Sequence, residues 1–349
     1  MANQYTTQAQ RVGTIKGEML MYAIPKQCLD VACTHFQMDQ NMGDTIIYGR
    51  WVPTGGSTGA VANNVDPSNT WSVLATDYET AEGITPAANT LTRKDITVQI
   101  KSYTILYSYT AKAARIYEDK LPPAMKKMAG QTMGLVSEMI KNGAFRGSTN
   151  KMYAGGTSRA TVKEPITNNL VSKIVRAFMN NRASMFTEVI NNNGQYGHKD
   201  IEAAFVFFGH TDLGYDIRQL PDFTPVAEYG KMTTIHALEL GAVPGIRFVL
   251  TPELQTVTNS GATAAGTGLK SSGTLVDIYP SMVMAEDAAA DLALRGEGSM
   301  ELIDLSVDQA DKADPTRERG YIGAKFWQAA FVQNDGWLMV VETGATDLG

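Results

Sequence analysis

Cysteine is scarce in this sequence: Cys28 and Cys33 are the two that occur among 349 residues. Two thiols cannot supply the disulfide framework of a small secreted scaffold, and a pair this close together with no second pair is a poor zinc site. We therefore expect both side chains to be free thiols, as is usual for a protein that folds in a reducing compartment.

Long apolar runs are missing as well. The opening MANQYTTQAQRVGT has no apolar segment of the kind found in secretory signals, and no run approaches the roughly 18 residues that a membrane-spanning helix needs. Charged residues make up 19% of the chain and the net charge is −6, which argues against a generally cationic nucleic-acid binder. These absences predict a protein made and folded in the cytoplasm, with no membrane partner.

Familiar catalytic motifs are absent too. The sequence contains no nucleophile elbow, no Walker loop, no dinucleotide-binding glycine pattern and no His-Glu-x-x-His helix. The histidines are scattered: His35, His198, His210 and His236. The pair His210 and Asp212 could serve as a base with its orienting group, yet no third residue accompanies it, and capping is the usual role at a strand-to-helix junction. We expect no enzyme activity, cofactor or metal, and keep a cytoplasmic hydrolase at His210 and Asp212 as the alternative from another class.

Lysine and arginine are absent from residues 53–92, forty residues that lie between the strand-like runs TIIYGRWV and ITVQI. A loop of this length is uncommon inside a compact domain. Its charged residues are all acids: Asp66, Asp77, Glu79 and Glu82. The segment therefore looks like a projection that contacts something other than its own core.

The strand that returns from this projection has a clear pattern with one interruption. Apolar residues alternate on even positions at Ile96, Val98 and Ile100, and then on odd positions from Tyr103 to Tyr109. A one-residue shift turns the apolar face to the other side of a strand, so we expect a bulge or sharp bend near residues 101–102.

The strongest helical pattern covers residues 124–145, after the sequence LPP, where apolar and small side chains recur at spacings of three and four and form one stripe. Pro122 and Pro123 suit its first turn. The methionines of the stripe are expected in the core, because soft side chains at helical spacing do not by themselves select a metal.

The remaining chain predicts a mixture of elements. We expect an amphipathic helix within 165–190, strands near 204–209 and 245–252, and a loop at 256–273. The run TLVDIYPSMVMAEDAAADLAL predicts a strand followed by a short helix, and the residues Asn334-Asp335-Gly336 predict a hairpin between the last two strands. Strands and helices do not alternate as a doubly wound sheet requires, so the expected class is α+β.

Charge is distributed unevenly along the chain. Residues 111–163 contain ten cations and three acids, a net charge of +7, whereas the projection carries −4. One reading is a solvated helix face beside an incidental acidic loop, since charge runs are usually surface. The other is a pair of complementary surfaces on neighbouring copies, with Lys126, Lys127 and Lys141 on a basic inner or inter-subunit surface.

The order of elements (an arm, a long β-ribbon, one long helix, an α/β body and closing strands) resembles the Hong Kong 97-type major capsid proteins of tailed phages. Four blocks resemble the capsid family named after phage N-four: TAEGITPAANTLTRKDITVQIKSYTILYSYT, FVFFGHTDLGYDIRQLPDFTPVAEYG, GIRFVLTPE and GYIGAKFWQAAFVQNDGWLMVVE. The resemblance extends over about residues 40–343 and is weakest in the arm and in the 256–273 loop.

The resemblance implies a division into parts. Residues 1–43 would be the N-terminal arm, 44–110 the extended E-loop, and 111–164 the peripheral domain with its spine helix at about 119–146. Residues 165–299 would form the axial domain, and 300–349 the terminal strands of the peripheral domain.

It also implies a function: copies assemble as homo-pentamers and homo-hexamers into an icosahedral shell, built in the host cytoplasm, that becomes the virion capsid around double-stranded DNA. The implied partners are a separate scaffolding protein, a portal, a possible decoration protein and DNA bound without sequence preference. A related alternative is an encapsulin, a cellular nanocompartment shell with the same fold.

The type member of the fold is locked by a bond between an E-loop lysine and an asparagine of another subunit. That chemistry needs an amine at the tip of the loop. Residues 53–92 contain no lysine, and Lys94 lies at the base of the ribbon. The carboxamides of the segment have no amine beside them there: Asn63, Asn64, Asn69 and Asn89. We therefore expect a shell that is held by non-covalent contacts.

Overall fold

The computed structural model describes residues 27–41, 43–51, 79–80, 82–83, 85, 93–115, 121–186, 203–229, 234–295, 300–307 and 316–349. The α-helices are α1 (Ala111–Arg115), α2 (Leu121–Arg146), α3 (Asn168–Asn180) and α4 (Gly214–Arg218). Short 3-10 helices are η1 (Leu29–Ala32), η4 (Arg159–Thr161), η5 (Thr211–Leu213) and η6 (Val226–Glu228). The strands are β1 (Cys33–Met38), β2 (Thr45–Trp51), β3 (Arg93–Gln99), β4 (Lys101–Thr110), β5 (Lys151–Tyr153), β6 (Phe205–His210), β7 (Thr224–Pro225), β8 (Glu239–Val243), β9 (Ile246–Thr251), β10 (Tyr279–Met284), β11 (Ala289–Leu294), β12 (Glu301–Leu305), β13 (Arg319–Val332) and β14 (Leu338–Thr343).

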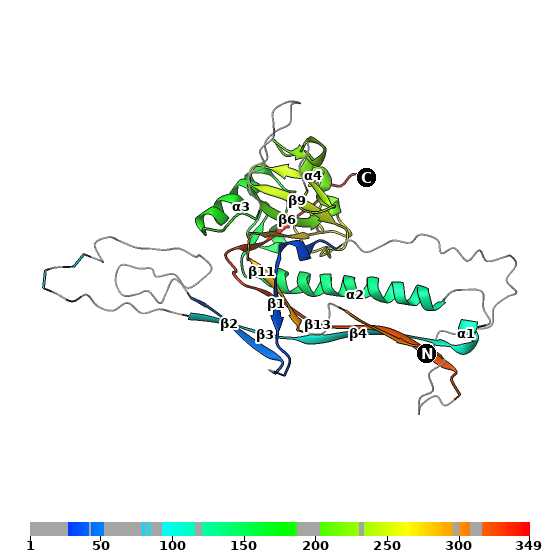
Figure 1. Ribbon diagram of the computed structural model, residues 1–349. Helices are drawn as coiled ribbons and strands as arrows, with labels where there is room; N and C mark the ends of the chain where they lie inside the picture. The colour runs from blue at the N-terminus through cyan, green and yellow to red at the C-terminus, as the bar shows by residue number, and fades with distance from the viewer. Residues whose placement is uncertain are drawn as a thin grey trace.

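The described strands form three sheets, and Figure 1 shows how they are arranged. A five-stranded sheet has the order β1-β11-β13-β12, with β4 paired to the other edge of β13. A seven-stranded sheet has the order β5-β14-β10-β6-β9-β8-β7 and forms the upper body in the figure. A two-stranded ribbon of β2 and β3 reaches out to one side. The α+β class is confirmed.

The long helix α2 lies along one face of the five-stranded sheet (Figure 1). Its apolar stripe places Ala129 and Met133 against Ala324 and Phe326 of β13, and all four side chains are at most 7% exposed. Strand residues that face one side of a sheet alternate, so Tyr103, Ile105 and Tyr107 of β4 pack on the same helix. The helix predicted from the pattern of residues 124–145 is confirmed, within α2.

The seven-stranded sheet is buried on both faces, because neighbouring residues of its central strands enter different cores. Phe205 and Phe207 of β6 pack against α3 and α4 in one cluster. Val206 and Phe208 pack on the opposite face, against Leu29 of η1 and the end of α2. This second cluster fastens the start of the described chain and the spine helix to the upper body.

The ribbon and its return strand behave as predicted. Strands β2 and β3 pair in antiparallel register from Thr45↔Gln99 to Trp51↔Arg93. Ile100 then separates β3 from β4, and β4 pairs with β13 instead. The interruption falls next to the predicted bend at 101–102, where the strand passes from the projection into the body.

Two local predictions at the end of the chain are wrong. Residues 334–336 do not close a hairpin: β13 pairs with β4, β11 and β12, whereas β14 pairs with β10 and β5. Residues 289–294 form strand β11 rather than a short helix, and the strand is held between β1 and β13. The predicted boundary between the parts 165–299 and 300–349 does not follow the division into sheets. Strand β11, which precedes it, belongs to the sheet of the spine helix, and β14, which follows it, belongs to the upper body.

Candidate assembly surface

The outer face of the ribbon exposes large apolar side chains. Successive residues of a strand point to opposite faces, and the inner face of the ribbon packs on the sheet, where the Tyr48 and Phe331 rings lie 5.3 Å apart. The outer face therefore carries Ile47 and Trp51, which are 57% and 61% exposed. Neighbouring exposed apolar groups of this size are typical of a contact surface.

The five-stranded sheet has a second uncovered apolar area. Its inner face is occupied by α2, so the alternate residues of the flanking strands point away from the helix. Among them are Leu106 of β4, 58% exposed, and Leu305 of β12, 46% exposed. Strand β4 is also paired on one edge alone within the described chain, which leaves backbone groups able to pair with another strand.

We define the assembly surface as Ile47, Trp51, Leu106 and Leu305. Reasoning from the sequence missed these four residues. The signal was present for the ribbon, since Ile47 and Trp51 occupy odd positions of β2 while its core residues occupy even ones. The same signal was present for Leu106, which occupies an even position of β4 while the core residues of that strand occupy odd ones. For Leu305 no such signal existed, because which face of β12 is covered by α2 is a tertiary property.

The acidic residues predicted for inter-subunit contact are partly described. Glu79 and Glu82 are exposed, whereas Asp66 and Asp77 lie outside the described residues. The proposed contacts of all four with a neighbouring copy stay a prediction.

The three predicted basic residues fall into different surroundings. Lys126 forms an ion pair with Asp304 of β12, and Lys127 is exposed. Lys141 was expected on a basic surface, and that prediction is wrong: it is 4% exposed and ion-paired with Asp30 and Asp291.

Burial by itself would lower the pKa of Lys141, but the hydrogen bond to Asp30 and the charge of Asp291 outweigh it, so the pKa is raised. The ammonium group therefore stays charged inside the molecule. The physical reason is the position of Lys141 on the face of α2 that meets η1 and β11, which a charge count along the chain does not reveal.

His210 and Asp212, the residues of the alternative hydrolase site, have structural roles. His210 caps η5, and its Nδ1 accepts the backbone N–H of Asp212. The Asp212 carboxylate accepts hydrogen bonds from Tyr279 Oη at 2.8 Å and Lys270 Nζ at 2.7 Å. Burial lowers the pKa of His210. The cluster joins the 256–273 loop to the sheet.

The two thiols are free, as predicted. Cys28 is buried, and burial together with the charge of Glu138 raises its pKa. Burial also raises the pKa of Cys33 to about 12. Within the described part of the chain, no helix has the length and apolar character needed to cross a membrane.

Known proteins similar to this chain are found by comparing structures, not by comparing sequences. No family model and no curated protein matches the sequence, so membership of the family named after phage N-four stays a prediction. The cyanophage Pam1 capsid subunit is 14% identical, with 99% of this chain and 100% of that chain covered and a TM-score of 0.62.

Two further capsid structures agree. The capsid of Ralstonia phage GP4 is 12% identical, with 97% of each chain covered and a TM-score of 0.63. The acidic stable capsid of Helicobacter pylori bacteriophage KHP30 is 8% identical, with 99% of this chain and 100% of that chain covered and a TM-score of 0.56. The chain therefore has the Hong Kong 97-type fold of phage capsid subunits.

Proposed function

We propose that this chain is the major capsid protein of a tailed bacteriophage. Its copies assemble into the pentamers and hexamers of an icosahedral shell that encloses double-stranded DNA, and its location is the virion. One observation carries the proposal: the match to capsid subunits extends over nearly the whole of both chains, ribbon and spine helix included. A structural role as a shell component, rather than catalysis, follows from it.

The assembly surface provides the physical driving force. Trp51 is 61% exposed, and a tryptophan buries up to about 250 Å². Burying the exposed part of the Trp51 side chain against a neighbouring copy stabilises the contact between the two copies by up to about 4 kcal/mol, at about 25 cal/mol per Å². Ile47 and the two leucines of the sheet add to this at every copy of the shell.

We assign the parts of the subunit from the sheets. The five-stranded sheet with α2 is the peripheral domain, the seven-stranded sheet with α3 and α4 is the axial domain, and the β2–β3 ribbon is the base of the E-loop. Residues 338–343 move to the axial domain on this assignment, and residues 289–294 move to the peripheral domain.

Charge complementarity supplies further contacts. The acidic segment 53–92 meets cations of a neighbouring copy, and Lys126 and Lys127 face either that segment or packaged DNA, whose phosphates they would bind without sequence preference. A separate scaffolding protein, a portal and a decoration protein complete the assembly, which takes place in the host cytoplasm.

The shell is held by non-covalent contacts, because segment 53–92 lacks lysine. Particles boiled in SDS should give a single band near the chain mass of 37.8 kDa. A ladder of oligomers that resists SDS and reductant would contradict this.

Electron microscopy of the protein, expressed alone and together with the neighbouring genes of its genome, tests the proposal. Closed icosahedral particles that contain DNA after packaging support it. Protein that stays monomeric under both conditions refutes it, and closed particles filled with a cargo protein would assign the chain to nanocompartments instead.

A variant pair tests the surface. Trp51→Ser removes the largest exposed apolar group of the ribbon, and we expect the folded subunit to survive but shells to be lost. The matched control is Met179→Ser, a residue of α3 that is 53% exposed and outside the assembly surface; it should assemble normally. Normal shells from Trp51→Ser would exclude this residue from the contact.

A further inference from the structure

A cavity of about 680 Å³ lies between α2 and the five-stranded sheet, near the start of the described chain. Its walls bring together residues from four separate elements. Asp30 of η1 and His35 of β1 line it, as do Asp291 of β11 and Gln328 of β13. None of these residues belongs to the assembly surface.

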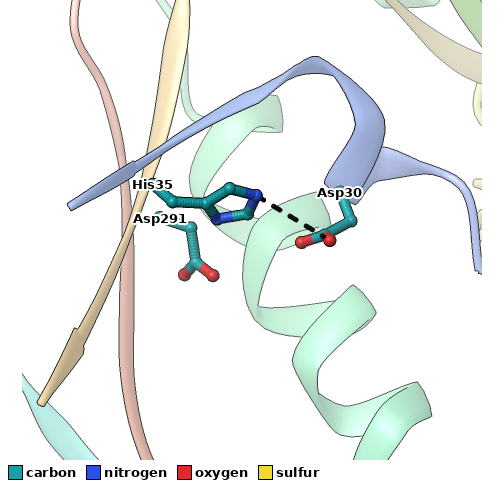
Figure 2. Close-up of side chains that lie close together, drawn as sticks. All are labelled: Asp30, His35 and Asp291. Atoms are coloured by element: carbon teal, nitrogen blue, oxygen red, sulfur yellow. Dashed lines mark ion pairs between the residues drawn. The ribbon is translucent and has the colours of Figure 1, made fainter. Parts of the chain in front are cut away.

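Three potential metal ligands converge there. One side-chain atom from each of Asp30, His35 and Asp291 lies within 4.8 Å of the others. Figure 2 shows the His35 ring between the two carboxylates, with His35 Nε2 3.9 Å from Asp30 Oδ2. The side chains of Asp30 and His35 are each 59% exposed, which leaves them room to rotate around one ion.

Gln328 provides an independent indication of a ligand. It is 5% exposed, and its Nε2 donates a hydrogen bond to Asp291 Oδ1 at 2.7 Å. Its Oε1 is buried and accepts no hydrogen bond within the described structure. Buried polar atoms without a partner are rare in proteins, and an amide carbonyl is an oxygen ligand for divalent cations.

The formal charge of the cavity is unbalanced. Three carboxylates line it, those of Asp30, Asp291 and Glu138, and Glu138 is 2% exposed. One ammonium, that of Lys141, opposes them, while Arg295 at the rim is 69% exposed and pairs with Asp39 outside the cluster. Glu138 is already satisfied by the backbone N–H groups of Cys28 and Leu29. The other two carboxylates, Asp30 and Asp291, share the single ammonium of Lys141 and keep a formal charge of −1, which favours a further cation.

We propose that Asp30, His35, Asp291 and the Gln328 carbonyl bind one divalent cation. A mixed set of carboxylate, imidazole and amide ligands suits Mn²⁺ or Zn²⁺ better than Mg²⁺ or Ca²⁺, which prefer oxygen alone. The ion ties η1 and β1 to β11 and β13. It shares its carboxylates with Lys141, which lowers its affinity but keeps the site compact in the ion's absence.

Metal titration of the purified full-length protein, first treated with a chelator, tests the site. We expect one-site binding of Mn²⁺ or Zn²⁺ by calorimetry, and a melting temperature that rises with metal concentration. His35→Ala should weaken binding by at least about tenfold. His236→Ala, which removes a histidine outside the cavity whose Nδ1 accepts the backbone N–H of Leu238, is the matched control and should bind as the wild type does.

A second variant distinguishes a metal site from a purely structural ion-pair cluster. Lys141→Met removes the competing ammonium, so it should destabilise the metal-free protein while tightening metal binding. Three results would overturn the proposal: wild-type protein that binds neither ion, His35→Ala that binds with unchanged affinity, or folded Lys141→Met that binds more weakly. If Lys141→Met does not fold, the His35→Ala titration decides the question alone.

Discussion

Tyr279→Phe removes one hydroxyl group from the Asp212 cluster and leaves the rest of the ring in place. Tyr279 is 2% exposed, and its Oη donates to Asp212 Oδ2 at 2.8 Å. A hydrogen bond to a charged group is worth about 1.5 to 3 kcal/mol. The Asp212 side chain is 30% exposed, so water replaces part of the lost bond, and we expect a loss of about 1 to 2 kcal/mol in the free energy of unfolding at neutral pH.

The pH dependence of this loss makes the prediction specific. Burial by itself would raise the pKa of Asp212, but hydrogen bonds from Lys270 and Tyr279 hold it below its ordinary value of 3.8. A carboxyl group whose pKa is lowered by folding contributes stability that is present above the unfolded value and is lost as the pH falls through the folded value. The difference between wild type and Tyr279→Phe should therefore be constant above about pH 4 and shrink at lower pH.

Urea unfolding followed by circular dichroism between pH 7 and pH 2 measures this difference. Tyr215→Phe is the matched control: Tyr215 lies on α4 near the cluster and is 46% exposed, so its substitution should change stability by less than about 0.5 kcal/mol. A Tyr279→Phe difference that is absent at pH 7, or that keeps its full size at pH 2, would refute the assigned hydrogen bond to the carboxylate.

Three further changes have defined outcomes. Cys28 and Cys33 should react with iodoacetamide at pH 8 far more slowly in the folded protein than in urea, because burial raises the pKa of both thiols; mass spectrometry of the labelled chain checks this. Met133→Ala should lower the free energy of unfolding by about 2 to 5 kcal/mol in urea denaturation, since Met133 is 2% exposed between α2 and β13. Arg159→Ala leaves the buried Glu342 carboxylate without its two-pronged partner and should cost about 1 to 3 kcal/mol, a range below that of a fully buried pair because Arg159 is 40% exposed; equal urea midpoints would contradict it.

The sequence alone determined the elements whose signals are local. The three- and four-residue spacing of the stripe predicted helix α2, because helical periodicity depends on neighbouring turns of the same segment. The change of phase after Ile100 predicted the break between β3 and β4 for the same kind of reason. The order of these elements also pointed to the capsid fold, although neither a family model nor a curated protein matches the sequence.

Tertiary structure decided which strands pair and which charges are buried. The turn at Asn334–Gly336 has hairpin residues, yet it links two different sheets, because β14 finds its partners in β10 and β5. Residues 289–294 have a composition that favours helix, but β1 and β13 offer hydrogen-bonding edges on both sides. Pairing energy comes from residues tens to hundreds of positions apart, so a local pattern does not contain it.

The charged residues show the same division. From the sequence, Lys126, Lys127 and Lys141 were predicted to form one basic surface. In the structure Lys126 pairs with Asp304 and Lys127 is exposed, whereas Lys141 is enclosed between Asp30 and Asp291. A lysine remains charged in the interior when carboxylates from distant segments compensate for the loss of water. Those segments meet because β11 pairs with β1 beside α2, and only the tertiary structure brings them together.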